Sequence, residues 1–310
     1  GTACAIPAIM ATRNIENWKE RLITILVTPF TTCSARLPVY AIIIALVIPE
    51  KRVFGIINMQ GLTLMLLYLL GFGMAIFSAY ILNKILKIKG KTYFIVEMPN
   101  YKLPMFKNVG INVIEKTKAF IFGAGKIILA ISIVLWFLAS YGPGEKFKNA
   151  EKIVIEKNLA KPLNHSELQN AIASQKLENS YIGLMGKTIE PAISPLGYDW
   201  KIGVAIISSF AAREVFVGTL ATIYSVGDSD NDNTIKNKMQ AEINPETGQK
   251  IFNFASGISL LLFYAFAMQC ASTIAITKKE TNSWKWPLGQ LIFMSGLAYL
   301  VALIAFQILK

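Results

Sequence analysis

The chain has 310 residues, of which 54% are hydrophobic and only 16% are charged. A soluble domain carries about 25% charged residues, so this composition argues against one. The net charge of +12 does not indicate nucleic-acid binding, because the lysines fall between apolar segments, where the cytoplasmic loops of membrane proteins collect positive charge.

Long apolar stretches without Asp, Glu, Lys or Arg define the class of protein. Three of them cover residues 53–83, 251–277 and 286–309. About 20 apolar residues in a helix cross the hydrocarbon core of a bilayer, so each stretch can form a transmembrane helix. A transmembrane β-barrel would instead show short alternating segments. The sequence therefore predicts an all-α polytopic membrane protein with the lipid bilayer as a partner.

The predicted elements begin with residues 1–12, which read as the end of a partial span followed by a short polar link. A small helical extramembrane insert is expected over 142–201. Six full spans are predicted over residues 22–48, 60–83, 119–141, 202–226, 254–277 and 286–309.

The orientation of the loops raises a conflict. The eight lysines of 84–118 favour a cytoplasmic position for that loop. If every predicted span crosses the membrane once, the loops alternate: 142–201 lies outside, 227–253 inside and 278–285 outside. The loop 278–285 nevertheless holds three lysines, which favour a cytoplasmic position. Two interpretations remain open: one segment is re-entrant, or the charge rule fails here.

Proline interrupts the first full span. Pro29 and Pro38 both lie within 22–48, so this span is expected to be kinked or broken. Pro7 stands in the partial span before it. Each proline can free a backbone carbonyl that contacts a passing ion, or can only bend the helix, which is the commoner outcome.

Cys4, Cys33 and Cys270 all stand in apolar surroundings, far apart in the sequence and without a CxxC motif. Structural disulfides are therefore not expected. Free cysteine often packs as a small hydrophobic residue. Buried packing and metal ligation both remain open for these three thiols.

Three charged residues fall inside predicted spans: Arg36, Arg213 and Glu214. A charge at the bilayer centre costs at least about 2.5–3.5 kcal/mol, so each needs a partner or a polar cavity. Arg213 and Glu214 are adjacent, and adjacent side chains on a helix do not face each other. Glu214 could instead form an ion pair with Arg36 of another span. Glu214 could otherwise serve as a cation ligand, whereas a guanidinium has no acceptor atom.

A weak internal repeat relates the sequences that begin at Cys4 and Cys270. In both, alanine follows the cysteine, a basic residue stands nine positions on, and tryptophan stands fourteen positions on. Five predicted spans separate the copies, which would make the repeat inverted. Inverted repeats around a site at the bilayer midplane are typical of transporters.

Five segments, taken in order, resemble the membrane part of the ferrous iron transport protein B (FeoB) family: GTACAIPAIMATR, ERLITILVTPFTTCSARLPVYA, FIVEMPNYKLP, SSFAAREVFVGTLATIY and MQCASTIAITKKETNSWKW. The family has an N-terminal GTPase domain, and a membrane region in which two Gate segments flank a core. The resemblance implies the end of the first Gate at 1–20, core-type helices at 21–86 and the second Gate at 202–279. Composition places a Lys-rich polar segment at 87–118, a transmembrane helix at 119–141, the insert at 142–201 and a C-terminal transmembrane helix at 280–310.

The resemblance implies Fe(II) import across the bacterial inner membrane, with Fe(II) as the transported substrate. It implies an iron path lined by Cys4, Cys33 and Cys270. The chemistry of the residues themselves adds Glu214 as a candidate ligand on this path, and Arg36, Arg213, Pro7 and Pro38 as candidate structural or gating residues. No GxxxxGK[ST] motif is present, so GTP and Mg would bind only to an N-terminal domain missing from this chain.

We therefore expect a fragment that is a permease portion and not an enzyme. The expected partners are its own GTPase domain, a small cytoplasmic Feo accessory protein and further copies in a homo-oligomer. Two alternatives remain open: a permease for organic solutes such as nucleosides, and a membrane scaffold or sensor that transports nothing.

Overall fold

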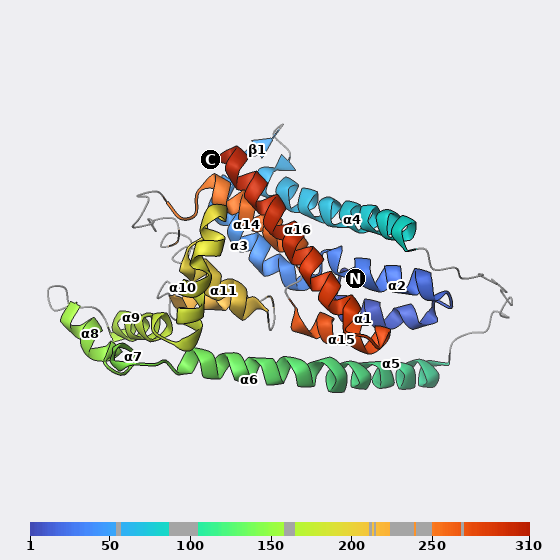
Figure 1. Cartoon of the computed structure of the whole chain (residues 1–310), viewed down its shortest axis with the longest axis horizontal. Helices are drawn as coiled ribbons and strands as arrows, with labels where there is room; N and C mark the ends of the chain where they lie inside the picture. The colour runs from blue at the N-terminus through green and yellow to red at the C-terminus, as the bar shows by residue number, and fades with distance from the viewer. Residues whose placement is uncertain are drawn as a thin grey trace.

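The computed structural model describes residues 1–53, 57–86, 105–157, 165–210, 213, 215–223, 239, 250–267 and 270–310. The described part is almost entirely helical (Figure 1). Its strands are β1 (Arg52–Val53) and β2 (Ile57–Asn58), which pair antiparallel with Arg52 opposite Asn58. The all-α class is thereby confirmed.

Four described segments are long and apolar enough to cross a membrane, by length and composition: Trp18–Val47, Met59–Ile85, Phe254–Thr281 and Lys285–Leu309. They correspond to four of the six predicted full spans. Of the other two, 119–141 belongs to a longer continuous helix, and 202–226 is divided into two short helices.

The chain begins with the short helix α1 (Ala5–Ala11) and the 3-10 turn η1 (Thr12–Asn14). Pro7 lies in the first turn of α1, where backbone N–H groups have no intrahelical acceptor, so it does not break the helix. The helix α2 (Trp18–Val27) follows, and the side chain of Asn17 caps it by accepting a bond from the Lys19 N–H.

The predicted break in the first full span lies between α2 and α3 (Leu37–Val47). Two 3-10 turns, η2 (Thr28–Phe30) and η3 (Ser34–Arg36), separate these helices, and the backbone between the turns is extended at Thr31 and Cys33. Pro29 lies within η2, and Pro38 occupies the first turn of α3. The span therefore consists of two half-helices.

The helix α4 (Met59–Ile85) packs against α2 and α3 as one long span. Farther along, α5 (Phe106–Phe120), the π-helical segment η4 (Ile121–Gly125) and α6 (Lys126–Ser140) form one long helix along an edge of the molecule (Figure 1). The predicted span 119–141 falls in its second half, which includes the apolar helix Ile128–Ser140.

The insert is helical, as predicted. It contains α7 (Glu145–Lys148), α8 (Ala150–Lys157), α9 (His165–Glu178) and α10 (Tyr181–Ile193), followed by the 3-10 turn η5 (Ser194–Leu196). These helices lie together at one end of the molecule (Figure 1).

The predicted span 202–226 is wrong, because it is a re-entrant hairpin of α11 (Trp200–Ser209) and α12 (Val215–Ile223). The two helices lie side by side, and the hydroxyls of Ser208 and Thr219 are 2.8 Å apart. Ser174 of the insert donates to the Ile223 carbonyl at 2.7 Å, so α12 ends where α11 began. Irregular backbone at membrane depth is tolerated where protein surrounds it.

The C-terminal part consists of α14 (Phe254–Phe266), α15 (Ala271–Thr281) and α16 (Lys285–Leu309). Ala267 is extended after α14, and Cys270 is extended before α15. The pair α14–α15 is therefore a second span built from two half-helices. The long helix α16 packs along α14, and Ser259 donates to the Ala302 carbonyl at 3.0 Å.

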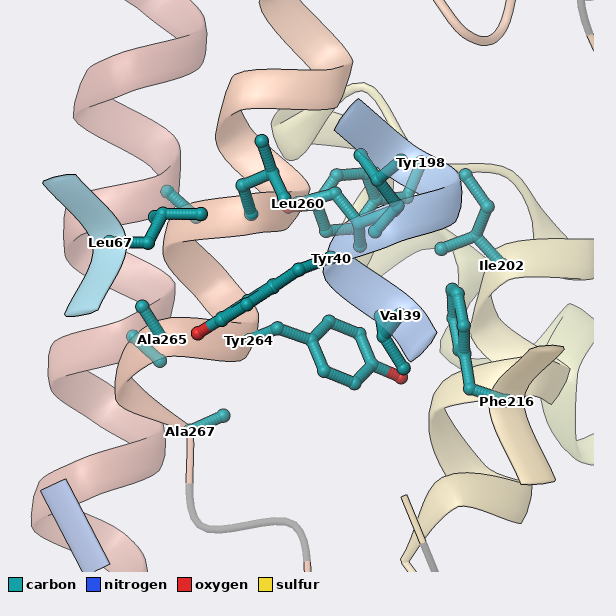
Figure 2. Packing of buried hydrophobic residues seen from close by; sticks show 14 of the residues in the cluster. Val39, Tyr40, Leu67, Tyr198, Ile202, Phe216, Leu260, Tyr264, Ala265 and Ala267 are labelled. Carbon is teal, nitrogen blue, oxygen red and sulfur yellow. The ribbon is translucent and has the colours of Figure 1, made fainter. Parts of the chain in front are cut away.

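The core lies beside these interruptions, where α3, α14 and the α11–α12 hairpin meet (Figure 2). Phe216 of α12 packs edge-on against Tyr264 of α14 with ring centroids 4.8 Å apart. The Tyr264 hydroxyl in turn donates to Ser209 at 3.2 Å. The tip of the hairpin is thus anchored to the middle of the bundle.

The basic residues now resolve the orientation conflict. Lys19 donates to the Asn83 carbonyl at 2.9 Å, and Arg21 pairs with Glu280 at 2.8 Å, so α2 begins at the same end of the bundle where α4 and α15 finish. The loop 278–285 therefore shares a side with the start of the Lys-rich segment. Simple alternation counted the hairpin as one crossing and so placed 278–285 on the other side. Under the charge rule, this lysine-rich end is predicted to face the cytoplasm.

The expectation of an inverted repeat is wrong for the same reason. Helices α1 and α15 lie against each other. Cys4 at the start of α1 is near Cys270 at the start of α15, and Arg13 after α1 pairs with Glu280 near the end of α15. The two copies therefore run parallel, as in repeats related by an axis along the membrane normal.

Candidate functional site

Each of the three cysteines immediately precedes a helix. Cys4 precedes α1, Cys33 precedes η3, and Cys270 precedes α15, and all three have extended backbone. Their thiols are free and half-buried. The sequence could place Cys33 in a broken span, but it did not predict that all three cysteines share this position.

The three helix starts converge in the middle of the bundle. The Ser34 backbone N–H donates to the Ala3 carbonyl at 3.4 Å, so the residues next to Cys33 and Cys4 are bonded to each other. The helix α1, which follows Cys4, packs on α15, which follows Cys270. The Ser34 hydroxyl donates to the Ala3 carbonyl at 2.7 Å, which ties η3 to the start of α1.

The re-entrant hairpin reaches the same place. The Ala271 N–H donates to the Phe210 carbonyl at 3.0 Å, which ties the start of α15 to the end of α11. We call this meeting point of the half-helices the junction. Within the described residues, no three His, Cys, Asp or Glu side chains are grouped closely enough to hold a metal ion. The thiols are therefore gathered in one region without forming a closed ligand set.

Arg36 is fully buried and bonds to backbone carbonyls. Its guanidinium donates to the Pro29 oxygen at 3.0 Å and to the Phe30 oxygen at 3.4 Å. Both oxygens belong to η2, where the interruption has removed their helical donors. Glu214, the partner proposed for Arg36, lies outside the described residues. The described bonds of Arg36 therefore satisfy two backbone carbonyls that follow the half-helix α2.

Arg213 has a similar position at the end of α14. Its side chain is buried and donates to the Ala267 carbonyl at 3.3 Å. Its second terminal nitrogen has no hydrogen-bond partner among the described residues. Arg213 and Arg36 are near enough to interact electrostatically. Each cation stands at the C-terminal end of a half-helix, where the helix dipole favours positive charge.

Buried hydroxyl groups complete the junction. Within the described part of the chain, Thr32, Tyr40 and Ser272 bury a side-chain oxygen without a hydrogen-bond partner. An unsatisfied buried polar group costs about 1–3 kcal/mol, so such groups usually meet water or a ligand. Sequence reasoning missed Tyr40, which the spacing of four residues from Arg36 could have indicated. Figure 2 shows Tyr40 reaching from α3 toward α14.

A buried ion cluster fixes α1 and α15 beside each other. The Glu280 carboxylate is 2% exposed, and the Arg13 Nε donates to both of its oxygens at 3.0 Å. Arg21 donates to the same carboxylate at 2.8 Å. Sequence reasoning noted Arg13 only as part of the repeat and missed Glu280. The cluster joins η1, α2 and α15 at the end of the bundle where α2 begins, and so helps to hold α1 beside α15.

Two family models match the chain. The Gate model, described as "Nucleoside recognition", matches residues 1–47 and 121–284. The FeoB_C model, described as "Ferrous iron transport protein B C terminus", matches residues 64–116. The two matches together include all three cysteines and both junction arginines.

Curated relatives match nearly the whole chain. The "Fe(2+) transporter FeoB" of Leptospira interrogans serogroup Icterohaemorrhagiae serovar Lai is 44% identical over 306 residues, which cover 99% of this chain and 41% of the relative. The "Fe(2+) transporter FeoB" of Staphylococcus aureus (strain MSSA476) is 33% identical over 309 residues, or 99% of this chain and 39% of the relative.

A third relative, from Porphyromonas gingivalis, is named "Fe(2+) transport protein A/Fe(2+) transporter FeoB fusion protein". It is 33% identical over 321 residues, which cover 99% of this chain and 37% of the relative. The chain thus spans about two fifths of the length of these relatives. No solved structure matches the chain.

Proposed function

The chain belongs to the Gate family and, within it, to the ferrous iron transport protein B group, of which it covers the C-terminal membrane portion, and from this premise we propose that the junction lies on the path of Fe(II) through the bacterial inner membrane. The chain is a multi-pass membrane protein with four apolar helices of spanning length among its described residues. The observation that carries the proposal is that Cys4, Cys33 and Cys270 each stand at the start of a helix, and that hydrogen bonds and packing bring these helix starts together.

The chemistry of the junction suits Fe(II) as a substrate. Fe(II) accepts thiolate, imidazole and carboxylate ligands, and a thiol must lose its proton to ligate a metal. In the proposal Cys4, Cys33 and Cys270 supply sulfur, and Glu214 supplies a carboxylate. Arg36 and Arg213 cannot ligate a cation, because a guanidinium has no acceptor atom.

An open ligand set fits transport better than storage. A transported ion must bind well enough to enter and weakly enough to leave. We therefore propose successive contacts with one or two thiols at a time, in place of a tetrahedral cage.

The coupling to GTP belongs to the proposal and lies outside this chain. The GTPase domain expected ahead of the chain would bind GTP and Mg and hydrolyse the nucleotide, and the permease portion would carry out no reaction itself. Half-helices that meet end to end can tilt without unwinding, so their ends are the natural hinges. A small protein of the transport protein A type is a proposed partner, since one relative is a fusion of that kind.

The test is Fe(II) influx into proteoliposomes that contain the full-length protein, with an iron-sensitive dye inside. Cys33→Ser and Cys270→Ser should each lower the initial influx at least tenfold, because a hydroxyl is a poor replacement for a thiolate. Met10→Leu is the matched control: it removes a sulfur that packs beside Cys4 in the α1–α15 cluster, without altering a proposed ligand. Unchanged influx in both serine variants, at normal protein levels, would refute the iron path.

A second candidate function follows from the description of the Gate model, "Nucleoside recognition". Under this alternative the junction would admit a nucleoside or a similar organic solute. Uptake of radiolabelled nucleoside by the same proteoliposomes, with no response to Fe(II), would favour it. No flux of either substrate would favour a scaffold or sensor.

A further inference from the structure

A groove of about 560 Å³ lies between α4 and α16, far from the insert, with Leu26 and Phe30 at its floor. Phe77 and Ile85 form the α4 wall, and Phe293 belongs to the α16 wall. These three side chains are between 57% and 66% exposed. In a bilayer, exposed apolar side chains on spanning helices face lipid, so the groove opens toward lipid.

The length of the groove matches one leaflet of a bilayer. Its lining runs from Met74 to Ile85 on α4 and from Lys285 to Leu297 on α16. At 1.5 Å per residue, both walls are roughly 17 Å long. The hydrocarbon core is about 30 Å thick, so the groove extends from one membrane surface to about the midplane.

The end of the groove at the membrane surface is basic. Lys285 and Trp286 line its mouth. Lys84 and Lys278 stand on the neighbouring helix ends, and the nearby Glu280 carboxylate is already paired with two arginines. Among the described residues no carboxylate forms an ion pair with Lys285. Lysine and tryptophan at this level are the residue types that meet lipid headgroups.

We propose that this groove binds one acyl chain of an anionic phospholipid of the cytoplasmic leaflet. The phosphate lies against Lys285, Trp286 lies at headgroup level, and the chain runs along the groove toward Phe30. The wall of α16 leaves room for it, because a Cβ added at Gly289 meets no atom within 4 Å. The bound chain touches Phe30 at the end of η2, so the lipid supports the half-helix that Arg36 also holds.

The experiment uses full-length protein in nanodiscs with phosphatidylglycerol that carries a photoreactive diazirine in its acyl chain. Mass spectrometry after illumination should place the crosslinks on α4 and α16 along the groove. Gly289→Phe should reduce this labelling at least fivefold by filling the groove. Gly296→Phe is the matched control, since Gly296 is also open on α16 but does not line the groove.

The headgroup is tested with a second pair of variants. Lys285→Gln should reduce the preference for phosphatidylglycerol over phosphatidylcholine roughly fivefold, which is the effect of one lysine near an anionic surface. Lys310→Gln, at the other end of α16, should leave it unchanged. Added inorganic phosphate should not compete, because the acyl chain supplies much of the affinity.

Three results would overturn the proposal. The first is equal labelling of the Gly289→Phe and Gly296→Phe proteins, with both shown to be folded by size-exclusion chromatography and thermal unfolding. The second is equal labelling by phosphatidylcholine and phosphatidylglycerol in the unmodified protein. The third is a protein–protein crosslink that places another segment of the full-length protein in the groove.

Discussion

Replacement of Glu280 by glutamine tests whether the buried ion cluster holds the junction together. The Glu280 carboxylate is 2% exposed and accepts bonds from Arg13 and Arg21. Glutamine has nearly the same shape, so the change removes the negative charge and one acceptor oxygen without creating a cavity. Arg13 and Arg21 would then face an amide.

The expected cost follows from the exposure of the partners. Hydrogen bonds to charged groups contribute about 1.5–3 kcal/mol each, and breaking a fully buried ion pair costs about 3–5 kcal/mol. The Arg13 and Arg21 side chains are 48% and 24% exposed, so water compensates part of the loss. We therefore expect Glu280→Gln to lower the free energy of unfolding by about 2 kcal/mol.

The control pair is Glu178 with Lys187, whose nitrogen and oxygen are 2.9 Å apart but whose side chains are 37% and 38% exposed. An exposed pair of this kind contributes at most about 1 kcal/mol. Glu178→Gln should therefore change stability by less than half as much as Glu280→Gln.

The assay is denaturant-induced unfolding of the full-length protein in detergent, followed by a double-mutant cycle of Glu280→Gln with Arg21→Gln. We expect a coupling energy of at least about 1 kcal/mol for residues in one network. Fe(II) influx should also fall in Glu280→Gln, because α1 and α15 carry Cys4 and Cys270. A coupling energy near zero, or equal effects at Glu280 and Glu178, would refute the reasoning.

Three further predictions concern packing, pH and topology. Gly71→Ala should destabilise the protein by about 1–3 kcal/mol and lower Fe(II) influx. The added Cβ would lie 2.8 Å from the Thr32 hydroxyl and 3.0 Å from the Phe30 carbonyl. Gly73→Ala is the control, because nothing lies within 4 Å of a Cβ added there. Burial raises the pKa of Asp199 to about 6, above about 3.9 in an unfolded chain, so its contribution to stability is present below pH 4 and lost as the pH rises through 6. Asp199→Asn should reduce the change in melting temperature between about pH 4 and pH 6. In a cysteine-free background, Asn179→Cys and Lys250→Cys should react with an impermeant thiol reagent from the same side of the membrane, and reaction from opposite sides would contradict the re-entrant hairpin.

The class of protein and the broken first span could be predicted because they depend on local properties. Charge-free apolar stretches define spanning helices, and Pro29 with Pro38 marks an interruption wherever the span is placed. The three cysteines could be singled out by type and context. Their common position at helix starts was not predicted. Pro7 lies in the first turn after Cys4, but no proline or glycine stands close to Cys270 to mark a helix start there.

The hairpin could not be predicted from hydropathy. Residues 202–226 form an apolar run of suitable length for one span, and the turn depends on contacts made elsewhere in the chain. Ser208 meets Thr219 across the hairpin, and Ser174 in the insert holds the Ile223 carbonyl. Counting 202–226 as one membrane crossing led to two further errors. It placed 278–285 on the wrong side of the bundle, and it made the two copies of the repeat antiparallel.

The ion cluster shows the same limit at the level of single side chains. Glu280 stands in a stretch rich in lysine and threonine that reads as an exposed loop. Its partner Arg13 is 267 positions away in the sequence. Charge pairing over such a separation depends on the direction in which α1 and α15 run, and that direction follows only from the fold.

The parallel arrangement of α1 and α15 also constrains how the junction can open. Both helices run from the junction to the cytoplasmic end, where the Glu280 cluster joins them to α2. The hairpin reaches the junction from the opposite side, through Phe210 and Arg213. Arg36 and Arg213 bond across the interruptions of different spans, so a displacement of either half-helix breaks bonds at the level of the thiols. Under the proposed iron path, movement on one side of the membrane would therefore be coupled at the junction to movement on the other.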